Sequence, residues 1–537
     1  MEVGFILDGR AVEVPDTGDS LLEVLRQRLG VRTAKDGCSP QGQCGCCTVW
    51  VDGTPRVACV TPARRVAGRN VTTLGGLDAD RRRAWAEAFA ATGASQCGYC
   101  TPGIIMRLAG LETRRELDDD AVSRALLAHQ CRCTGWQTIL EAARVISPGH
   151  SSIPAESRPG APPPVTLTGG CARRDLGAAA RRATIEGGSP QQVGLAVVLG
   201  QGGFADDTAP PDALVAVFDG KGDWTVAETL AEARARAGKV QGRRSTVGLH
   251  YPLEVPPGVW DLCLRTTWVE PAYLETDASW CRPGGEPSSP LANGGAFGAK
   301  MSSAAPAAAR RLADELGRTV RVVLSREDVV RTGPKRPPMA AGIRRDGTGI
   351  MRVGRTPGIA AAVAQVAPGL LVEEDEVVGP PTSAQIRGAG WAEAAVLAAV
   401  ASRLDDGTGP IRVVGPSGGH AEAWVADDWL RVRVSCGDPL DEVVLRSYCI
   451  GAAHMAMGWV RSEGIAVDPV SGAPQDLTIR SFGILGASQM SPVEVEVVDE
   501  GGPPVNGSDA VLAAVAAGVW MHDGLPVEWP TTRTEKR

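Results

Sequence analysis

The chain has 537 residues, well above the roughly 100–200 residues of one domain, which excludes a single small module. Apolar residues make up 43% of it and charged residues 22%, as in ordinary globular proteins, whereas aromatic residues make up only 4%. The net charge is −7, and the arginines are interleaved with acids, which excludes the basic face that nucleic acid requires.

The first ten residues lack the pattern of a signal peptide, and no apolar run approaches the roughly 18 residues of a membrane helix. We therefore expect a cytoplasmic protein without membrane insertion.

The first 76 residues predict a small α+β unit. Apolar residues alternate over residues 3–7 and again over residues 11–14, with a turn at Asp8-Gly9 between them, which predicts a β-hairpin. Asp19 or Ser20 can cap a following helix that stops at Gly30. A cysteine-rich loop comes next.

Residues 77–146 predict a mostly helical unit, because apolar residues there recur with helical spacing. The expected helices are Arg81–Thr92, Pro102–Gly110, Asp119–His129 and Gln137–Val145. Residues 147–165 contain six prolines with Ser and Gly, which predicts an extended linker and a domain boundary.

Residues 166–537 predict mixed α/β architecture, because short β-branched runs alternate with alanine-rich helical stretches. The expected strands are Leu195–Leu199, Val320–Leu324, Leu430–Val434 and Val493–Val498. The expected helices are Ala304–Leu316 and Trp391–Leu404.

Nine of the fourteen cysteines lie within the first 133 residues, in tight groups that favour metal binding over disulfides. The first set lies in a glycine-rich loop and matches the four-thiolate ligand set of a [2Fe–2S] cluster: Cys38, Cys44, Cys47 and Cys59. Its first interval is one residue longer than in plant-type ferredoxins, and residues 40–42 can loop out to absorb the difference. Cys46 is out of register, so we interpret it as a bystander.

The second set comprises Cys97, Cys100, Cys131 and Cys133. Four cysteines also suit zinc, but zinc sites favour two C-x2-C pairs, whereas here one pair is C-x-C. Iron–sulfur is therefore the favoured interpretation, and zinc remains the alternative. Thr101-Pro102 predicts a helix that begins directly after Cys100, with its free amides facing the sulfurs.

The cysteine-bearing segments resemble the iron–sulfur part of the molybdenum hydroxylases, the xanthine dehydrogenase and aldehyde oxidase family: QGQCGCCTVWVDG, QCGYCTPGIIM and HQCRCTGWQTILEAAR. The resemblance implies a plant-ferredoxin-like β-grasp [2Fe–2S] domain over residues 1–76. It also implies a four-helix [2Fe–2S]-binding domain over residues 77–146, with the second cysteine set as its ligands.

Several C-terminal segments resemble, in order, loops of the family's molybdenum-binding domain: GGFADDTAPPDALVAV, WVEPAYLETDASW, NGGAFGAK and AQIRGAG. Residues 166–537 would thus form a shortened molybdopterin-binding-like domain of mixed α/β fold. The resemblance implies molybdopterin, with or without an added nucleotide, held by Gly295, Phe297, Gly298, Arg387 and Gly388.

The family's general base, a glutamate, is missing at its expected position, which falls on Gly502. Glu500 and Arg387 are the candidate catalytic residues that remain. Val269 occupies the place where some members carry a glutamine beside the metal. The linker holds no flavin domain, so the resemblance implies a partner subunit that binds FAD, together with a full-length molybdenum subunit.

Three functions follow from these observations. The first is an oxidoreductase in which a molybdopterin centre hydroxylates a small aldehyde or N-heterocycle and two [2Fe–2S] clusters carry the electrons to a flavin or other acceptor. The second is an electron-transfer and scaffold subunit that binds no molybdenum and docks a separate catalytic chain. The third is a zinc-stabilised binding protein.

Overall fold

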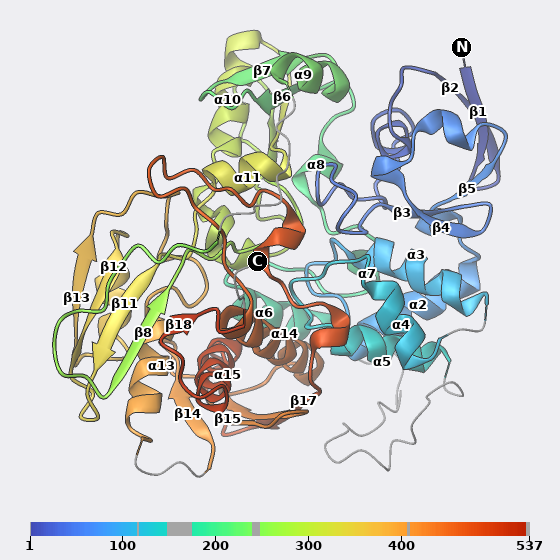
Figure 1. Cartoon of the computed structure of the whole chain (residues 1–537). Coiled ribbons are helices and arrows are strands. Elements are labelled where there is room, and N and C mark those ends of the chain that lie inside the picture. The colour runs from blue at the N-terminus through green and yellow to red at the C-terminus, as the bar shows by residue number, and fades with distance from the viewer. Residues whose placement is uncertain (1, 115–116, 148–173, 239–247, 405–408, 533–537) are drawn as a thin grey trace.

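The computed structural model describes residues 2–114, 117–147, 174–238, 248–404 and 409–532 (Figure 1). These residues form a mixed α/β structure with four β-sheets. The N-terminal sheet and the helices after it lie beside the C-terminal sheets (Figure 1). The predicted linker lies outside the described residues, apart from Ser147.

The N-terminal sheet has five strands in the order β2-β1-β5-β3-β4. Their bounds are β1 Glu2–Leu7, β2 Arg10–Pro15, β3 Thr48–Val51, β4 Thr54–Val57 and β5 Asn70–Thr72. β1 and β2 form the predicted antiparallel hairpin. The expected helix is a short α1 (Leu21–Glu23), capped by Ser20 and Glu23, that continues as a π-helical turn over Val24–Arg28.

All four predicted helices of residues 77–146 are present: α2 Ala79–Thr92, α3 Thr101–Glu112, α4 Asp119–Leu126 and α5 Gln137–Ile146. Asp78 caps α2, and Gly93 ends it in the left-handed conformation. α3 begins directly after Cys100, as predicted. None of the helices in the described ranges has both the length and the apolar character needed to cross a bilayer.

The prediction of a strand at Leu195–Leu199 is wrong, because Leu195–Val198 is the helix α7. Val197 and Val198 are buried, and Val197 contacts Gly98, whose lack of a side chain allows the close approach. Packing against the α2–α3 connection therefore overrides the β-propensity of this run. Along the chain, α7 follows α6 (Leu176–Gly187) and precedes α8 (Ala205–Thr208).

Three sheets make up the C-terminal part, in the orders β7-β6-β10-β9, β13-β12-β11-β8-β18 and β14-β15-β16-β17. The strands of the first are β6 Leu214–Phe218, β7 Trp224–Ala227, β9 Ala278–Cys281 and β10 Val320–Val323. Those of the second are β8 Leu262–Thr266, β11 Met339–Ile343, β12 Gly349–Gly354, β13 Leu370–Asp375 and β18 Glu528–Trp529. Those of the third are β14 Ile411–Val414, β15 His420–Val425, β16 Leu430–Ser435 and β17 Val493–Val498. The remaining three predicted strands are thus confirmed.

The C-terminal helices are α9 Leu230–Ala237, α10 Ala305–Leu316, α11 Arg326–Thr332, α12 Ile359–Ala364, α13 Trp391–Ala401, α14 Glu442–Arg461 and α15 Ser508–His522. α14 and α15 pack along each other, and α13 packs against α15. The many alanines on these helices allow the close approach, which fills the core with small side chains.

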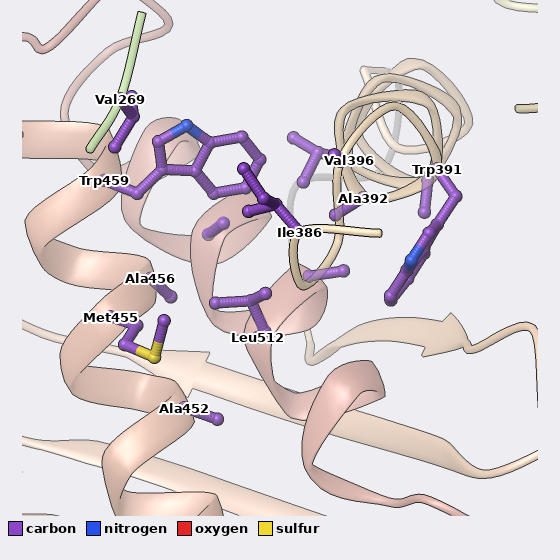
Figure 2. Packing of buried hydrophobic residues seen from close by; sticks show 14 of the residues in the cluster. Val269, Ile386, Trp391, Ala392, Val396, Ala452, Met455, Ala456, Trp459 and Leu512 are labelled. Carbon is purple, nitrogen blue, oxygen red and sulfur yellow. The ribbon is translucent and has the colours of Figure 1, made fainter. Parts of the chain in front are cut away.

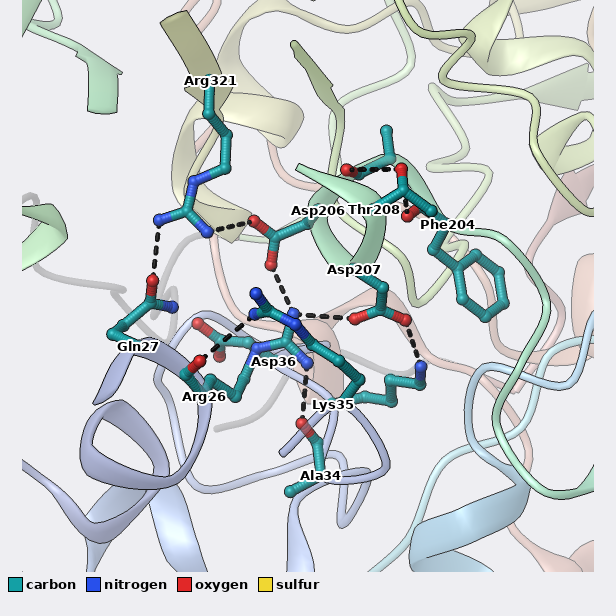
Figure 3. Close-up of polar contacts among 12 residues, drawn as sticks. Arg26, Gln27, Ala34, Lys35, Asp36, Phe204, Asp206, Asp207, Thr208 and Arg321 are labelled. Carbon is teal, nitrogen blue, oxygen red and sulfur yellow. Dashed lines mark hydrogen bonds and ion pairs between the residues drawn. The ribbon is translucent and has the colours of Figure 1, made fainter. Parts of the chain in front are cut away.

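A buried ionic network joins the N-terminal sheet unit to the C-terminal part (Figure 3). Arg26 binds both Asp206 and Asp207, at 2.6 and 2.9 Å. Lys35 binds Asp207 and also donates to the carbonyl of Gly200. Arg321 binds Asp206 at 3.2 Å from the other side. Cations and carboxylates alternate, so each buried charge has a partner.

The network predicts a loss of stability in acid. Burial raises the pKa of Asp206, but Arg321 and Arg26 together hold it below its ordinary value. Because the unfolded value is about 3.9, this carboxylate stabilises the fold above that pH and less as the pH falls below it. We expect the thermal unfolding midpoint of Asp206→Asn to depend less on pH between about 4 and 2 than that of the wild type. Asp212→Asn changes an exposed acid nearby and should retain the wild-type pH dependence.

Candidate metal centres

The first cysteine set is buried at the end of the β3–β4 hairpin. Cys47 directly precedes β3 and Cys59 follows β4, so the hairpin brings them together, and the Cys59 amide donates to the Cys47 sulfur at 3.4 Å. The Cys38 thiol contacts those of Cys44 and Cys59. The Cys59 thiol also contacts that of Cys47, and each of the four residues is at most 5% exposed. The structure therefore brings the predicted first set together.

The second set is formed by the α2–α3 and α4–α5 connections. Each connection contributes one cysteine to each of two pairs: the sulfurs of Cys97 and Cys133 lie 3.6 Å apart, and Cys100 contacts Cys131. The hydrogen bond from Cys100 lowers the pKa of Cys131 to about 6, which favours its thiolate form. Cys100 stands at the N-terminus of α3, where free amides favour negative charge.

The cysteines of the second set meet as two pairs of sulfurs, whereas in the first set the Cys38 thiol contacts two others. In the part of the chain that the structure describes, no three His, Cys, Asp or Glu side chains have the arrangement of a single-ion site. A [2Fe–2S] cluster takes two protein ligands on each iron, whereas zinc takes four around one point. The paired thiols of the second set therefore fit a two-iron cluster better than they fit zinc.

Glycines make room at the first set. A Cβ atom at Gly37 would lie 3.2 Å from the Cys44 sulfur and 3.1 Å from the Cys46 sulfur. A Cβ at Gly45 would lie 2.4 Å from the ring of His129, so this position accepts glycine alone, whereas the contacts at Gly37 are tight. The loop closes tightly around the sulfurs because these residues have no side chain.

The two cysteine sets are in direct backbone contact. Gly103, in the first turn of α3, packs on Gly45. A Cβ added at Gly103 would lie 2.3 Å from the carbonyl oxygen of Gly45. The amide of Gln130, just before the second set's Cys131, donates to the Cys44 carbonyl at 3.0 Å. Only protein backbone separates the sets at this point, which suits electron transfer between them.

His129 lies between the two sets. Its spacing in the sequence matches no metal-ligand pattern and therefore predicts an ordinary histidine. Its Nε2 atom is 3.2 Å from the Thr48 hydroxyl, and it is 3% exposed. Burial lowers its pKa to about 4, so the ring is neutral at physiological pH. In the sequence, only its place two residues before Cys131 indicates that His129 lies near the cysteine sets.

Arg132, between two ligands of the second set, is bound to the C-terminal part. Its guanidinium makes a bidentate pair with Glu463 at 2.5 and 2.6 Å and donates to the Pro271 carbonyl. The two side chains are 4% and 2% exposed. Gly458 of α14 makes room, because a Cβ there would lie 2.2 Å from a Glu463 oxygen. The pair cancels the charge of Arg132 beside the second set.

Two of the five residues predicted to hold molybdopterin line a small cavity. Figure 2 shows Val269, Ile386, Met455, Trp459 and Leu512 converging there. The cavity measures about 30 Å³ and is also lined by Phe297 and Arg387. Ligand pockets for drug-sized molecules measure roughly 300–1,000 Å³, so this space suits a few water molecules. It does not accommodate a molybdopterin.

The chain's own contacts close this cavity. Arg387 donates to Asp509 and Ser508 at 2.7 and 2.6 Å, and its amide donates to the carbonyl of Phe297 at 2.9 Å. A Cβ at Gly298 would lie 1.8 Å from the Gln385 carbonyl, so the two predicted cofactor loops pack directly on each other. Gly388 lies in the same group, against Arg336, whereas Gly295 packs on Ser189.

The candidate base does not reach the cavity. Glu500 follows β17, accepts a hydrogen bond from Ser435 at 2.7 Å, and has a side chain that is 54% exposed. Gly502 has a φ of 90° and open space beside it. Neither residue lines the cavity, so the structure does not join them to Arg387.

The cysteine-bearing part of the chain is similar to known iron–sulfur proteins. The family model "[2Fe-2S] binding domain" matches residues 73–144. The nicotinate dehydrogenase small FeS subunit of Eubacterium barkeri is 36% identical over 133 residues, which are 24% of this chain and 84% of that protein. The xanthine dehydrogenase iron-sulfur-binding subunit of Escherichia coli is 38% identical over 127 residues, covering 23% and 79%.

Among solved structures, the aldehyde oxidoreductase of Desulfovibrio gigas is similar in fold, with a TM-score of 0.69 and 14% sequence identity. The alignment covers 100% of this chain and 99% of that chain. The fold likeness therefore extends over both the cysteine-bearing part and the C-terminal part.

The burial of Arg132 predicts a strong dependence of stability on Glu463. In Glu463→Ala the buried guanidinium loses its partner, and we expect the free energy of unfolding to fall by about 3–5 kcal/mol. The control is Asp523→Ala, which breaks the more exposed pair with Arg461, 25% and 15% exposed, and should cost about 1 kcal/mol or less. Urea unfolding followed by tryptophan fluorescence measures both. Equal losses in the two variants contradict the burial argument.

Proposed function

Since this chain belongs to the molybdenum hydroxylase family, the xanthine dehydrogenase and aldehyde oxidase family, we propose that it is the iron–sulfur electron-transfer subunit of such an oxidoreductase. It carries electrons from a molybdenum centre that hydroxylates an aldehyde or N-heterocycle to a flavin or another acceptor. The observation that carries this proposal is the convergence of eight cysteines, six of them buried and two half-buried, into two sets in backbone contact.

Cys38, Cys44, Cys47 and Cys59 would hold one [2Fe–2S] cluster, and the second cysteine set would hold another. Each bound cluster supplies a site that takes up one electron. The protein's part is to bury the ligands, to donate backbone amides to their sulfurs and to keep the two sets adjacent. The Gln41 amide, which donates to the Cys38 sulfur at 3.2 Å, is one such donor.

We assign the clusters to two domains. The five-stranded sheet, together with the short helix α1 and the π-helical turn that follows it, supports a ferredoxin-like β-grasp over residues 1–76. The helices α2–α5 support a four-helix [2Fe–2S]-binding domain over residues 77–146. Residues 166–537 then form the shortened molybdenum-hydroxylase-like domain.

The molybdopterin of the complex is assigned to a partner chain. The cavity of about 30 Å³ at the predicted cofactor loops is too small for it, and the nitrogens of Arg387 are engaged by the chain's own side chains. The alternative is that this chain is itself a compact hydroxylase with Glu500 and Arg387 as catalytic residues. The separation of Glu500 from the cavity weighs against that alternative.

A second partner, with bound FAD, is expected at the surface above the first set. Val60 follows Cys59 directly and is 59% exposed. Arg56, Arg64 and Arg65 are exposed nearby in the sequence, and none makes an ion pair with the described residues. An apolar centre with basic surroundings suits an acidic redox protein.

The metal content distinguishes the proposed subunit from its alternatives. We expect about four irons and no molybdenum per chain in protein purified without oxygen, expressed alone or with its neighbouring genes. Elemental analysis measures both metals, and a host whose own molybdenum enzymes are loaded provides the positive control. One molybdenum per chain favours the compact hydroxylase. Zinc without iron overturns the proposal.

The cysteine assignments predict different results for two neighbouring residues. Cys44→Ser should lose the iron of the first set, about half of the total, and should stop electron transfer to the flavin while molybdenum is still reduced by substrate. Cys46→Ser is the matched control, equally buried, and should retain all the iron. Iron analysis and visible absorption of the two variants measure this. Unchanged flavin reduction in Cys44→Ser, or iron loss in Cys46→Ser, contradicts the assignment.

A further inference from the structure

Arg326, the first residue of α11, is a fully buried cation without a counterion in the described part of the chain. Its Nη2 atom donates to the carbonyls of Gly37 and Leu274, at 2.8 and 2.7 Å. Its Nε and Nη1 atoms have no hydrogen-bond partner among the described residues, and its exposed fraction is 0%. No described carboxylate lies within 4 Å of the guanidinium.

The acidic residues next to Arg326 in the sequence make hydrogen bonds with other residues. Asp328 closes the cap of α11 by accepting from Ser325, at 2.6 Å to its hydroxyl. Glu327 accepts from the side-chain amide of Gln41 at 2.9 Å. An arginine keeps its charge in a protein interior, and a buried charge without a counterion is strongly unfavourable. The Tyr273 ring, whose centroid lies 5.7 Å from the guanidinium carbon, adds a cation–π contact, but no formal negative charge of the described residues pairs with this cation.

The guanidinium lies beside the first cysteine set. The Leu274 carbonyl that accepts from Arg326 is 3.2 Å from the position of a Cβ at Gly37. The same position is 3.2 Å from the Cys44 sulfur and 3.1 Å from the Cys46 sulfur. Arg326, Gly37 and these sulfurs therefore share one small, buried volume.

We propose that Arg326, supplied by the C-terminal part, is the charge partner of the cluster held by the first cysteine set and raises its reduction potential. This inference rests on the proposed function. An oxidised [2Fe–2S] cluster with four thiolates is an anion, and reduction adds one more negative charge. A fixed cation nearby favours the reduced form more than the oxidised form, which raises the potential.

The second set has no such uncompensated cation in the described residues. Arg132 lies beside it, but Glu463 makes a bidentate pair with that guanidinium. Arg326 is thus a positioning residue for one cluster only. A change at Arg326 should move the potential of the first cluster and leave that of the second unchanged.

The test is a dithionite titration of the full chain, followed by electron paramagnetic resonance of the two reduced clusters. Cys44→Ser and Cys100→Ser assign each signal to its set. In Arg326→Gln, at the potential where the wild-type first cluster is half reduced, we expect its ratio of reduced to oxidised form to fall by about tenfold or more. Arg326→Lys keeps the charge and should remain close to the wild type.

Arg321→Gln is the matched control, because it tests whether a looser contact between the two parts of the chain alone changes the potentials. Arg321 donates to Gln27 of the N-terminal unit, and its charge is paired with Asp206. It should leave both potentials unchanged. If Arg326→Gln and Arg326→Met lose only the first cluster's iron while Arg326→Lys retains it, the charge is required for binding and the inference holds.

An unchanged first potential in Arg326→Gln, or equal shifts in both clusters, overturns the inference. Equal loss of iron in the lysine and neutral variants overturns it as well, since packing would then explain the effect. A wild-type chain without iron instead refutes the proposed function, so the two failures are distinguishable.

Discussion

Buried thiolates need N–H donors or cations around them, because a low-dielectric interior does not stabilise an anion by itself. Much of this structure serves that need. Backbone amides reach the sulfurs of Cys38 and Cys47, and α3 begins at Cys100. Glycines at the loops allow the chain to approach the sulfurs closely, since no Cβ intervenes. The cysteine loops are therefore shaped by the charge that they enclose.

The same constraint explains how the C-terminal part is attached. Arg26 and Lys35 of the N-terminal unit have their carboxylate partners, Asp206 and Asp207, in the C-terminal part. Arg132 has its partner, Glu463, there as well. In each case the contact between the two parts removes a charge from water and gives it a partner of opposite charge. These charge pairs therefore join the two parts beside an apolar cluster that contains residues of both.

The sequence predicted those features that depend on local spacing. The helices of residues 77–146 follow from apolar periodicity, and the cysteine sets come from short segments in which the ligands are close neighbours. The strand predicted at Leu195–Leu199 is wrong because β-branched residues carry less weight there than packing against Gly98. Sequence spacing carries no information about Arg132 with Glu463, 331 residues apart, or Arg326 with Gly37, 289 residues apart. Those contacts depend on the tertiary fold.

A cofactor pocket and a wall, by which we mean a surface packed against the cysteine loops, impose different requirements on the same fold. A pocket needs open volume and a base that reaches it, whereas a wall needs dense packing and fixed charges at the right places. At the predicted cofactor loops this chain has a cavity of about 30 Å³, and the two carboxylates that line it, Glu270 and Glu463, are paired with Lys335 and Arg132. On the side of the cysteine loops it has Arg326 at Gly37 and Glu463 at Arg132. If a partner chain holds the pterin, as we propose, this chain still has a reason to keep its C-terminal part, because that part places Arg326 and Glu463 beside the cysteine sites.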